Sequence, residues 1–171
     1  MYQLENYIRN IPDFPEPGIQ FKDITPLLRH PGVLTQVIQQ LTEPFIDDQI
    51  TAIVGMEARG FIFGSLVAKE LDVGFVPLRK PGKLPYDKHS ISYDLEYGST
   101  QLEIHTDALA GTDRVLLIDD LIATGGTAAA SIELIRKLGA EVAACAFVVE
   151  LDFLEGRKKL PVDRIHALIH Y

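Results

Sequence analysis

Apolar residues in this chain follow two alternating patterns. Short, nearly continuous apolar runs, as in buried parallel strands, alternate with longer segments whose apolar residues recur at helical spacing. The predicted strands are 50–55, 73–78, 114–118, 141–149 and 164–170. The predicted helices are a short one over 2–10 and longer ones over 32–45, 61–71 and 128–138. This alternation predicts an α/β fold with a mainly parallel central sheet flanked by helices.

Residues 11–26, IPDFPEPGIQFKDITP, follow neither pattern. Four prolines and a glycine argue against a long regular element here. The segment also carries Phe14, Ile19, Phe21 and Ile24, so we expect an ordered loop that folds back onto the body of the protein. At its end, Thr25 is predicted to cap a helix that has Pro26 at its first position.

The remaining connections are polar. Residues 91–97 and 100–105 alternate in polarity on either side of Gly98 and Ser99, which predicts a hairpin. Residues 79–90 read as a loop, and residues 153–159 read as a polar surface turn. The chain shows no internal repeat or interdomain linker, and 171 residues that are 47% hydrophobic suit a single domain over 1–171.

Composition excludes several classes of function. A net charge of −8 argues against general nucleic-acid binding, which depends on neutralising phosphates. No apolar run approaches the length of a membrane span, and the polar, acid-bearing N-terminus is not typical of a signal peptide. The single cysteine, Cys145, lies in an apolar run, which favours a buried structural thiol and a reducing, cytoplasmic setting. An anionic substrate would need local positive charge, and basic residues gather at 79–83.

The most informative stretch is Arg114–Ala130, RVLLIDDLIATGGTAAA. It predicts a buried strand, the carboxylates Asp119 and Asp120 where that strand ends, and a turn through Gly125 and Gly126 into a helix. The first N–H groups of a helix lack partners and carry partial positive charge, and glycine lets a ligand approach the backbone, so the turn can hold a phosphate. The stretch matches neither the nucleotide P-loop nor the dinucleotide fingerprint. An acidic pair beside a phosphate cradle suits a sugar phosphate, with the acids facing ribose hydroxyls or a metal ion.

Ligands of parallel α/β sheets bind at the carboxyl ends of the strands. Three candidate segments follow predicted strands, at 56–60, 79–83 and 119–127. We therefore expect these segments to converge on one cleft.

Five stretches of the chain can be compared with known families: FPEPGIQFKDITPLL, VGMEARGFIFG, PLRKPGKLP, SYDLEYG and VLLIDDLIATGGT. Together, in this order and spacing, they resemble the adenine phosphoribosyltransferases of the type I phosphoribosyltransferase family, in which the last stretch is the phosphoribosyl pyrophosphate (PRPP) motif. The resemblance implies transfer of phosphoribose from PRPP to adenine with Mg²⁺, giving AMP and pyrophosphate, by a homodimer. It also implies a small N-terminal hood over 1–30 and a mobile hairpin lid over 80–105.

The resemblance assigns roles to individual residues. Ala123, Thr124, Gly125, Gly126 and Thr127 match the 5′-phosphate cradle. Asp119 and Asp120 match the acidic pair at the ribose, where either could hold Mg²⁺ through water. Residues matching pyrophosphate and PRPP contacts are Arg59, Arg79, Lys83 and the Glu57–Ala58 peptide, for which the resemblance implies a non-proline cis bond. Residues matching the adenine site are the proton-transfer partner Glu96, its neighbour Tyr97, the stacking ring of Phe21, and the backbone near Gln20 and Lys22.

Other interpretations remain open from the sequence. Glu57-Ala58-Arg59 departs from the Asp-Ser-Arg of other members, which could alter loop contacts. Phe21 could be a packing anchor, and Glu96 could be a solvated hairpin residue. One alternative function is a phosphoribosyltransferase for another base such as hypoxanthine, xanthine or guanine. A second is a regulatory protein that senses PRPP without catalysis, although the chain shows no basic patch or helix-turn-helix.

Overall fold

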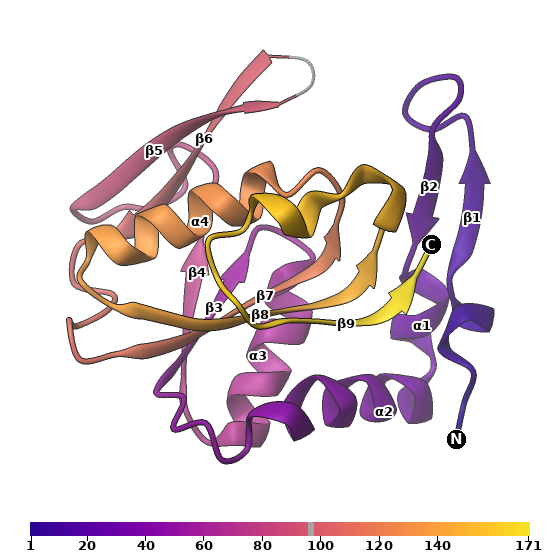
Figure 1. Ribbon diagram of the computed structural model, residues 1–171, viewed down its shortest axis with the longest axis horizontal. Helices are drawn as coiled ribbons and strands as arrows, with labels where there is room; N and C mark the ends of the chain where they lie inside the picture. The colour runs from indigo at the N-terminus through magenta and orange to yellow at the C-terminus, as the bar shows by residue number, and fades with distance from the viewer. Residues whose placement is uncertain (96–97) are drawn as a thin grey trace. The chain divides into compact units, whose positions relative to one another are not determined.

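The computed structural model describes residues 1–95 and 98–171 (Figure 1). The chain forms two compact units, Met1–Gln40 and Leu41–Tyr171. None of the described helices combines the length and the apolar character that crossing a membrane would require.

The N-terminal unit contains a small antiparallel sheet that the sequence did not predict. After a 3₁₀ turn at Leu4–Tyr7, strand β1 (Arg9–Pro12) pairs with β2 (Gln20–Asp23). The prediction of an irregular loop was wrong because most of the prolines stand at the end of β1 or in its connection to β2, where they remove no ladder hydrogen bond. The predicted helix over 2–10 is therefore only the 3₁₀ turn.

Two helices complete this part of the chain, α1 (Thr25–Arg29) and α2 (Pro31–Thr42), and a 3₁₀ turn follows at Glu43–Phe45. The N-cap of α1 is Ile24, and the predicted cap, Thr25, is the first helical residue. Asp23 explains the shift, because its carboxylate accepts hydrogen bonds from the Thr25 N–H at 2.9 Å and the Thr25 hydroxyl at 2.8 Å. The carboxylate therefore satisfies the Thr25 N–H, one of the donors at the helix start that have no intrahelical partner.

The C-terminal unit is built on a five-stranded parallel sheet of order β4-β3-β7-β8-β9, as the apolar runs predicted. Its strands are β3 (Ala52–Met56), β4 (Gly74–Leu78), β7 (Arg114–Ile122), β8 (Glu141–Glu150) and β9 (Ile165–His170). Helices α3 (Gly60–Leu71) and α4 (Gly126–Lys137) cover opposite faces of the sheet (Figure 1).

The core lies on the central strands. Every residue of β3 is buried, and the apolar run at the start of β7 has no exposed surface from Val115 to Ile118. Cys145 on β8 is also fully buried, as predicted. Burial raises the pKa of its thiol to about 12, so at neutral pH it is a small apolar residue.

Strands β3 and β7 form a topological switch point. The connection through α3 leads from β3 outward to β4, and the connection through α4 leads from β7 in the other direction to β8. The two connections therefore diverge, and the loops that follow β3 and β7 lie next to the crevice between them, where open α/β sheets bind ligands.

The predicted end of β7 was wrong. The acidic pair was expected to terminate the strand, but β7 continues to Ile122. Leu121 and Ile122 pair with Val149 and Glu150, because β8 is long enough to keep the ladder going past the acids. Asp119 and Asp120 consequently have fixed strand geometry.

A separate hairpin follows β4. Strands β5 (Lys88–Leu95) and β6 (Gly98–His105) pair antiparallel, which confirms the predicted hairpin, although β5 begins earlier than expected. Backbone hydrogen bonds between Arg79 and Glu103 join β6 to the segment after β4.

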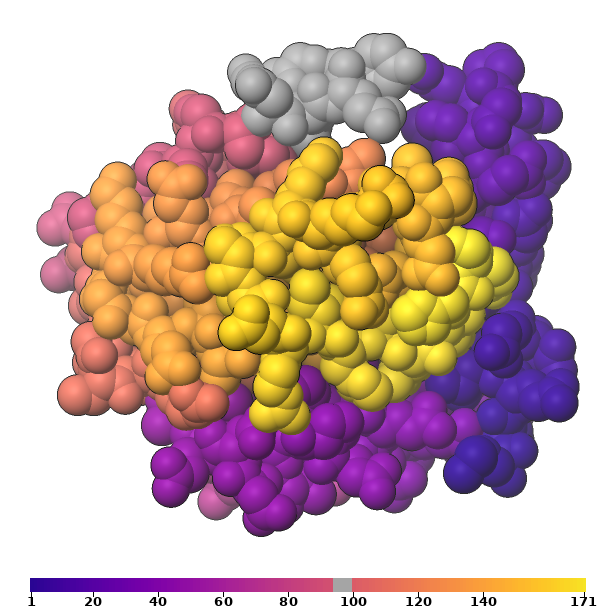
Figure 2. Space-filling model, viewed as in Figure 1, coloured from indigo at the N-terminus to yellow at the C-terminus, as the bar shows by residue number. Residues whose placement is uncertain are grey.

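The segment after β8 is the polar surface turn that the sequence predicted, since most of residues 153–159 are exposed. It contains two 3₁₀ turns, Asp152–Leu154 and Gly156–Lys159, and Gly156 is buried. In Figure 2 the residues after β8, in yellow, lie against the α4 region, in orange. The segment's charged side chains are exposed as expected, but the buried Gly156 packs its backbone against Ala123 and Gly125, which the sequence did not predict.

Candidate active site

A cleft of about 300 Å³ opens at the switch point between β3 and β7. Its lining comes from the loop after β3, the chain after β4, the hairpin, and the end of β7 with the start of α4. The lining residues are Glu57, Ala58, Arg59, Lys80, Tyr93, Thr100, Leu102, Asp119, Asp120, Leu121 and Thr127. The three segments expected to converge therefore do so.

The loop between β7 and α4 surrounds a second, smaller hollow of about 100 Å³. All the residues predicted to cradle a phosphate, from Ala123 to Thr127, line it, together with Met56, Asp119, Leu121, Ile122, Ala128 and Phe147. Gly125 is the N-cap of α4 and has a φ of 79°, a conformation that favours glycine. No side chain of the described residues caps this helix, so its first N–H groups are available to an anion.

The acidic pair is held beside both hollows. The Arg59 Nε lies 3.0 Å from Asp120 Oδ2, and Asp119 Oδ1 accepts the Asp120 N–H at 2.8 Å. Burial and the neighbouring Asp120 charge raise the pKa of Asp119 well above its usual range. Burial also raises the pKa of Asp120, and the Arg59 charge opposes this rise. The pair is therefore poised to gain a cation or a hydrogen-bond donor from a ligand.

Close packing fixes where the pair points. A Cβ on Gly60, the first residue of α3, would lie 2.8 Å from Asp119 Oδ1 and 2.9 Å from the Ile118 carbonyl oxygen. Only a residue without a side chain lets α3 begin so close to β7. The glycine after Arg59 therefore allows the arginine and the carboxylates to meet.

The loop after β3 carries a second charge cluster. The Glu57–Ala58 peptide is cis, as the resemblance implied. Glu57 Oε2 accepts hydrogen bonds from the Arg79 Nε at 3.0 Å and from the Lys80 N–H at 2.8 Å. The Arg79 hydrogen bond lowers the pKa of Glu57, so the carboxylate stays ionised and ties the β3 loop to the chain after β4.

The remaining predicted site residues are Lys83, Gln20, Phe21, Lys22, Glu96 and Tyr97. Lys83 is exposed, and it is not among the described residues that line the cleft, whereas its neighbour Lys80 is. Gln20, Phe21 and Lys22 lie on β2 of the N-terminal unit. There the rings of Phe21 and Phe14 pack edge to face, with 5.1 Å between their centroids. Glu96 and Tyr97 lie outside the described residues.

Several lining residues were missed from the sequence. Lys80 belongs to the basic run at 79–83, which was the signal that could have identified it. Tyr93 stands in the SYDLEYG stretch, and its hydroxyl donates a hydrogen bond to Thr127 Oγ1 at 3.2 Å. Thr100 and Leu102 carried no signal, because only the paired register of the hairpin strands places them, whereas Leu121 lies within the predicted segment 119–127.

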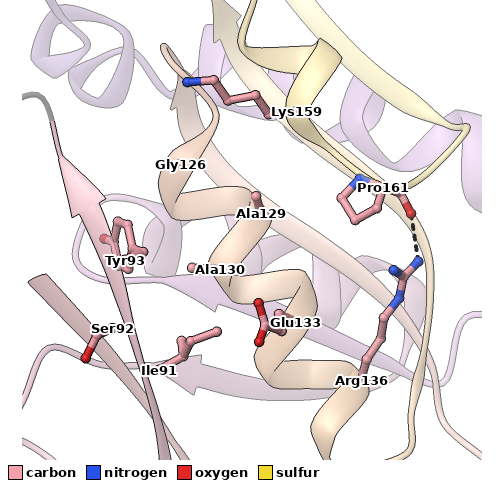
Figure 3. Close-up of a pocket in the computed structure, with 10 residues that line it drawn as sticks. All are labelled: Ile91, Ser92, Tyr93, Gly126, Ala129, Ala130, Glu133, Arg136, Lys159 and Pro161. Atoms are coloured by element: carbon pink, nitrogen blue, oxygen red, sulfur yellow. Dashed lines mark hydrogen bonds between the residues drawn. The ribbon is translucent and has the colours of Figure 1, made fainter. Parts of the chain in front are cut away.

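A larger cavity of about 430 Å³ lies between β5 and α4 (Figure 3). Tyr93 borders both this cavity and the strand-end cleft, and Gly126 borders both this cavity and the phosphate hollow. The remaining lining residues are Ile91, Ser92, Ala129, Ala130, Glu133, Arg136, Lys159 and Pro161. Asp119, Asp120 and Arg59 line the strand-end cleft of about 300 Å³ and not this larger cavity, so the candidate chemistry lies in the strand-end cleft.

Comparison with known proteins agrees with this geometry. Residues 24–168 match the family model described as the phosphoribosyl transferase domain. A relative from Methylococcus capsulatus named adenine phosphoribosyltransferase is 65% identical over 171 residues, which is all of both chains. The chain belongs to the adenine phosphoribosyltransferase family.

Solved structures of the family share the fold. The adenine phosphoribosyltransferase of Rhodothermus marinus is 55% identical, with a TM-score of 0.94 over 98% of this chain and 96% of that one. The enzyme of Saccharomyces cerevisiae, solved with adenine and D-2,5-dideoxy-2,5-imino-altritol 1,6-bisphosphate, is 44% identical, with a TM-score of 0.89 over 95% and 96% of the two chains. The fold predicted from the sequence is thereby confirmed.

Proposed function

We propose that this chain transfers the 5-phosphoribosyl group from PRPP to adenine, forming AMP and releasing pyrophosphate in purine salvage. The observation that carries the proposal is the switch-point cleft, where a largely buried acidic pair, a charge-bearing loop and a neutral helix-start loop meet. Family membership supplies the substrates, since the Saccharomyces relative was solved with adenine.

The 5′-phosphate belongs in the hollow formed by Ala123–Thr127. Backbone N–H groups at the start of α4 and the hydroxyls of Thr124 and Thr127 offer donors without bringing side-chain charge. The hollow of about 100 Å³ has room for one phosphate group.

Asp119 and Asp120 belong with the ribose. Carboxylates there accept hydrogen bonds from sugar hydroxyls and favour the positive charge that the anomeric carbon gains as pyrophosphate leaves. Carboxylate oxygens are also what Mg²⁺ prefers, and because burial and the Asp120 charge raise the pKa of Asp119, a cation beside it would favour its ionised form. The pair therefore fits a PRPP-bound Mg²⁺, which would neutralise the leaving pyrophosphate.

The pyrophosphate belongs with the loop after β3. Arg59 lines the cleft, as do Lys80 and the Glu57–Ala58 peptide, and we assign them to stabilise the departing charge. Arg79 acts mainly by holding Glu57, with which it is already paired. Lys83 extends the same basic run and would reach PRPP only from an exposed position.

The adenine site follows from the family resemblance. We assign Phe21 to stack on the purine and the backbone near Gln20 and Lys22 to read its edge. Glu96 would move the adenine proton during attack on the sugar, and Tyr97 would help to close the lid and exclude water.

The test is pyrophosphate release from PRPP with adenine, hypoxanthine, guanine, xanthine or orotate as acceptor, with and without Mg²⁺. We expect turnover with adenine and Mg²⁺, and turnover with each other base lower by about 10²-fold or more. Faster release with another base would reassign the substrate. PRPP binding without release on any base would indicate a sensor.

We also propose that the chain works as a cytoplasmic homodimer. The family resemblance suggests the assembly, and the single buried thiol suits a reducing compartment. Sedimentation equilibrium would test the dimer: a mass near twice the 19.0 kDa of one chain supports it, and a mass near 19.0 kDa at micromolar concentration contradicts it.

A further inference from the structure

The segment after β8 touches the backbone of the phosphate loop directly. A Cβ on Gly125 would lie 2.2 Å from the Gly156 carbonyl oxygen, and a Cβ on Gly156 would lie 2.1 Å from the Ala123 carbonyl oxygen and 2.8 Å from the Gly125 nitrogen. Neither position has room for a side chain. The position of the Gly156 backbone therefore limits where the loop can lie.

One ion pair holds this segment in place. Arg157, the residue after Gly156, donates from Nε to Glu150 Oε1 at 2.7 Å and from Nη2 to Glu150 Oε2 at 2.6 Å. Glu150 ends β8 and is 3% exposed, so its carboxylate is fixed by the sheet. A bidentate pair between a planar guanidinium and a fixed carboxylate restrains orientation as well as distance.

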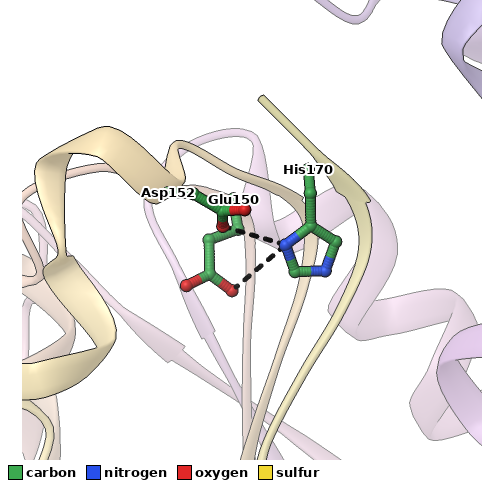
Figure 4. A group of neighbouring side chains, drawn as sticks. All are labelled: Glu150, Asp152 and His170. Atoms are coloured by element: carbon green, nitrogen blue, oxygen red, sulfur yellow. Dashed lines mark hydrogen bonds and ion pairs between the residues drawn. The ribbon is translucent and has the colours of Figure 1, made fainter.

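Glu150 also lies beside Asp152 and His170 (Figure 4). His170 Nδ1 is 2.9 Å from Asp152 Oδ1 and 4.0 Å from Glu150 Oε2. This group could be read as a metal site, but both oxygens of Glu150 already accept hydrogen bonds from Arg157. The geometry therefore favours a structural brace between the end of β8 and the segment that follows it.

We propose that Arg157, fixed by Glu150, is a positioning residue for the 5′-phosphate loop. Arg157 borders neither the cleft nor the phosphate hollow among the described residues. It acts through Gly156, whose backbone keeps Ala123 and Gly125 where the N–H groups of the loop converge on a phosphate. The inference rests on the proposed function, because it takes the loop to be the 5′-phosphate site.

The first experiment measures binding of ribose 5-phosphate by calorimetry, together with steady-state kinetics, for wild type and Arg157→Ala. We expect Kd for ribose 5-phosphate and KM for PRPP to rise by about tenfold or more, since small misplacements of binding groups are costly. KM for adenine should stay near the wild-type value. Arg157→Lys should recover part of the loss, because lysine keeps the charge but not the planar fork.

Arg164→Ala is the matched control. Arg164 is similarly exposed, pairs with Asp48, and stacks on Phe45 with its Cζ 5.1 Å from the ring centroid, in a different part of the unit. The Arg164→Ala variant should have a lower Tm than wild type, while its affinity for ribose 5-phosphate stays at the wild-type value. Equal affinities for Arg157→Ala and Arg164→Ala would overturn the inference.

A double variant separates positioning from stability. Arg157→Ala leaves the buried Glu150 without its main partner, which destabilises the fold. In Arg157→Ala with Glu150→Gln, the buried charge is gone, so Tm should return toward wild type while the affinity for ribose 5-phosphate stays low. If Tm and the affinity for ribose 5-phosphate both recovered in the double variant, the brace would act only on stability and the inference would be overturned. Failure of wild type itself to bind ribose 5-phosphate would refute the proposed function instead.

Discussion

The two loops at the β3–β7 switch point are built from different groups, although we assign both to one phosphate-bearing substrate. The loop after β3 presents Glu57 and Arg59, which pair with Arg79 and Asp120. The loop after β7, Ala123–Gly126, has no ionisable side chain and is held by backbone packing against Gly156. One loop depends on titratable side chains, and the other depends on backbone geometry.

Because of this difference, the two loops should respond differently to salt and pH. Interactions between charged side chains weaken with salt and change with pH. Backbone N–H donors at a helix start do not titrate, and they tolerate little change in loop shape. Substitutions in the β3 loop should therefore give pH-dependent effects, whereas substitutions in the β7 loop should give similar losses at every pH.

The largest effect is expected for Gly125→Ala. The new Cβ would meet the Gly156 backbone at 2.2 Å at a φ of 79°, so we expect kcat/KM for PRPP to fall by about 10²-fold or more. The free energy of unfolding should drop by about 1–3 kcal/mol. Gly111→Ala is the control, because its Cβ would have its nearest neighbour at 3.8 Å. A loss that disappeared at one end of the pH range would contradict the comparison.

Arg59→Ala should come next. Removing a cation from the pyrophosphate site should lower kcat/KM in the reverse reaction, AMP with pyrophosphate, by about 10²-fold. Arg59→Lys should restore only part of the rate, since a point charge does not replace the fork. Wild-type kinetics with pyrophosphate in the alanine variant would remove Arg59 from the site.

Asp119→Asn should separate activity from stability. Because burial and Asp120 raise the pKa of Asp119, the wild-type carboxyl stabilises the fold below its ordinary pKa of about 3.9, and this contribution is lost as pH rises through the raised value. The variant should thus be more stable than wild type at neutral pH, and the difference should vanish in acid, while KM for PRPP rises. Asp107→Asn, at an exposed position, is the control, and denaturant titrations across pH make the measurement. A variant less stable than wild type at pH 7 would refute this account of the pair.

Glu57→Gln should change the free energy of unfolding least, and this change should depend on pH in the opposite sense to that of Asp119→Asn. The lowered pKa of Glu57 means that the carboxylate stabilises the fold above its ordinary pKa of about 4.3, and this contribution is lost as pH falls through the lowered value. Arg79 and Glu57 are both partly exposed, so we expect the variant to lose less than about 1 kcal/mol at pH 7. The same titration checks this, and a loss that persisted at pH 2 would point to packing instead of charge.

Much of the fold could be predicted from the sequence because its strands are buried on both faces. Apolar runs such as Val115–Ile118 carry that burial directly in their composition. The failures occurred where pairing overrides local composition. The prolines of residues 11–26 hid the β1–β2 pair, and the long partner strand β8 carried β7 past its acids to Ile122.

The candidate site was predictable where one short stretch contains it, as with Asp119–Thr127. Contacts between distant segments left no local signal. The polar residues 153–159 gave no sign that Gly156 packs on Gly125, and nothing near Leu102 predicted that it would line the cleft. The basic run pointed to the right region but favoured Lys83, whereas Lys80 borders the cleft because its backbone is tied to Glu57.

The most direct test is to follow the backbone amide resonances while titrating ribose 5-phosphate and, separately, pyrophosphate with Mg²⁺. The account predicts that ribose 5-phosphate shifts the amides of Thr124–Thr127 and leaves those of Ala58 and Arg59 nearly unchanged. Pyrophosphate should shift Ala58 and Arg59 instead. Shifts at Ala58 and Arg59 with ribose 5-phosphate, while Thr124–Thr127 stay in place, would contradict the division of the two loops.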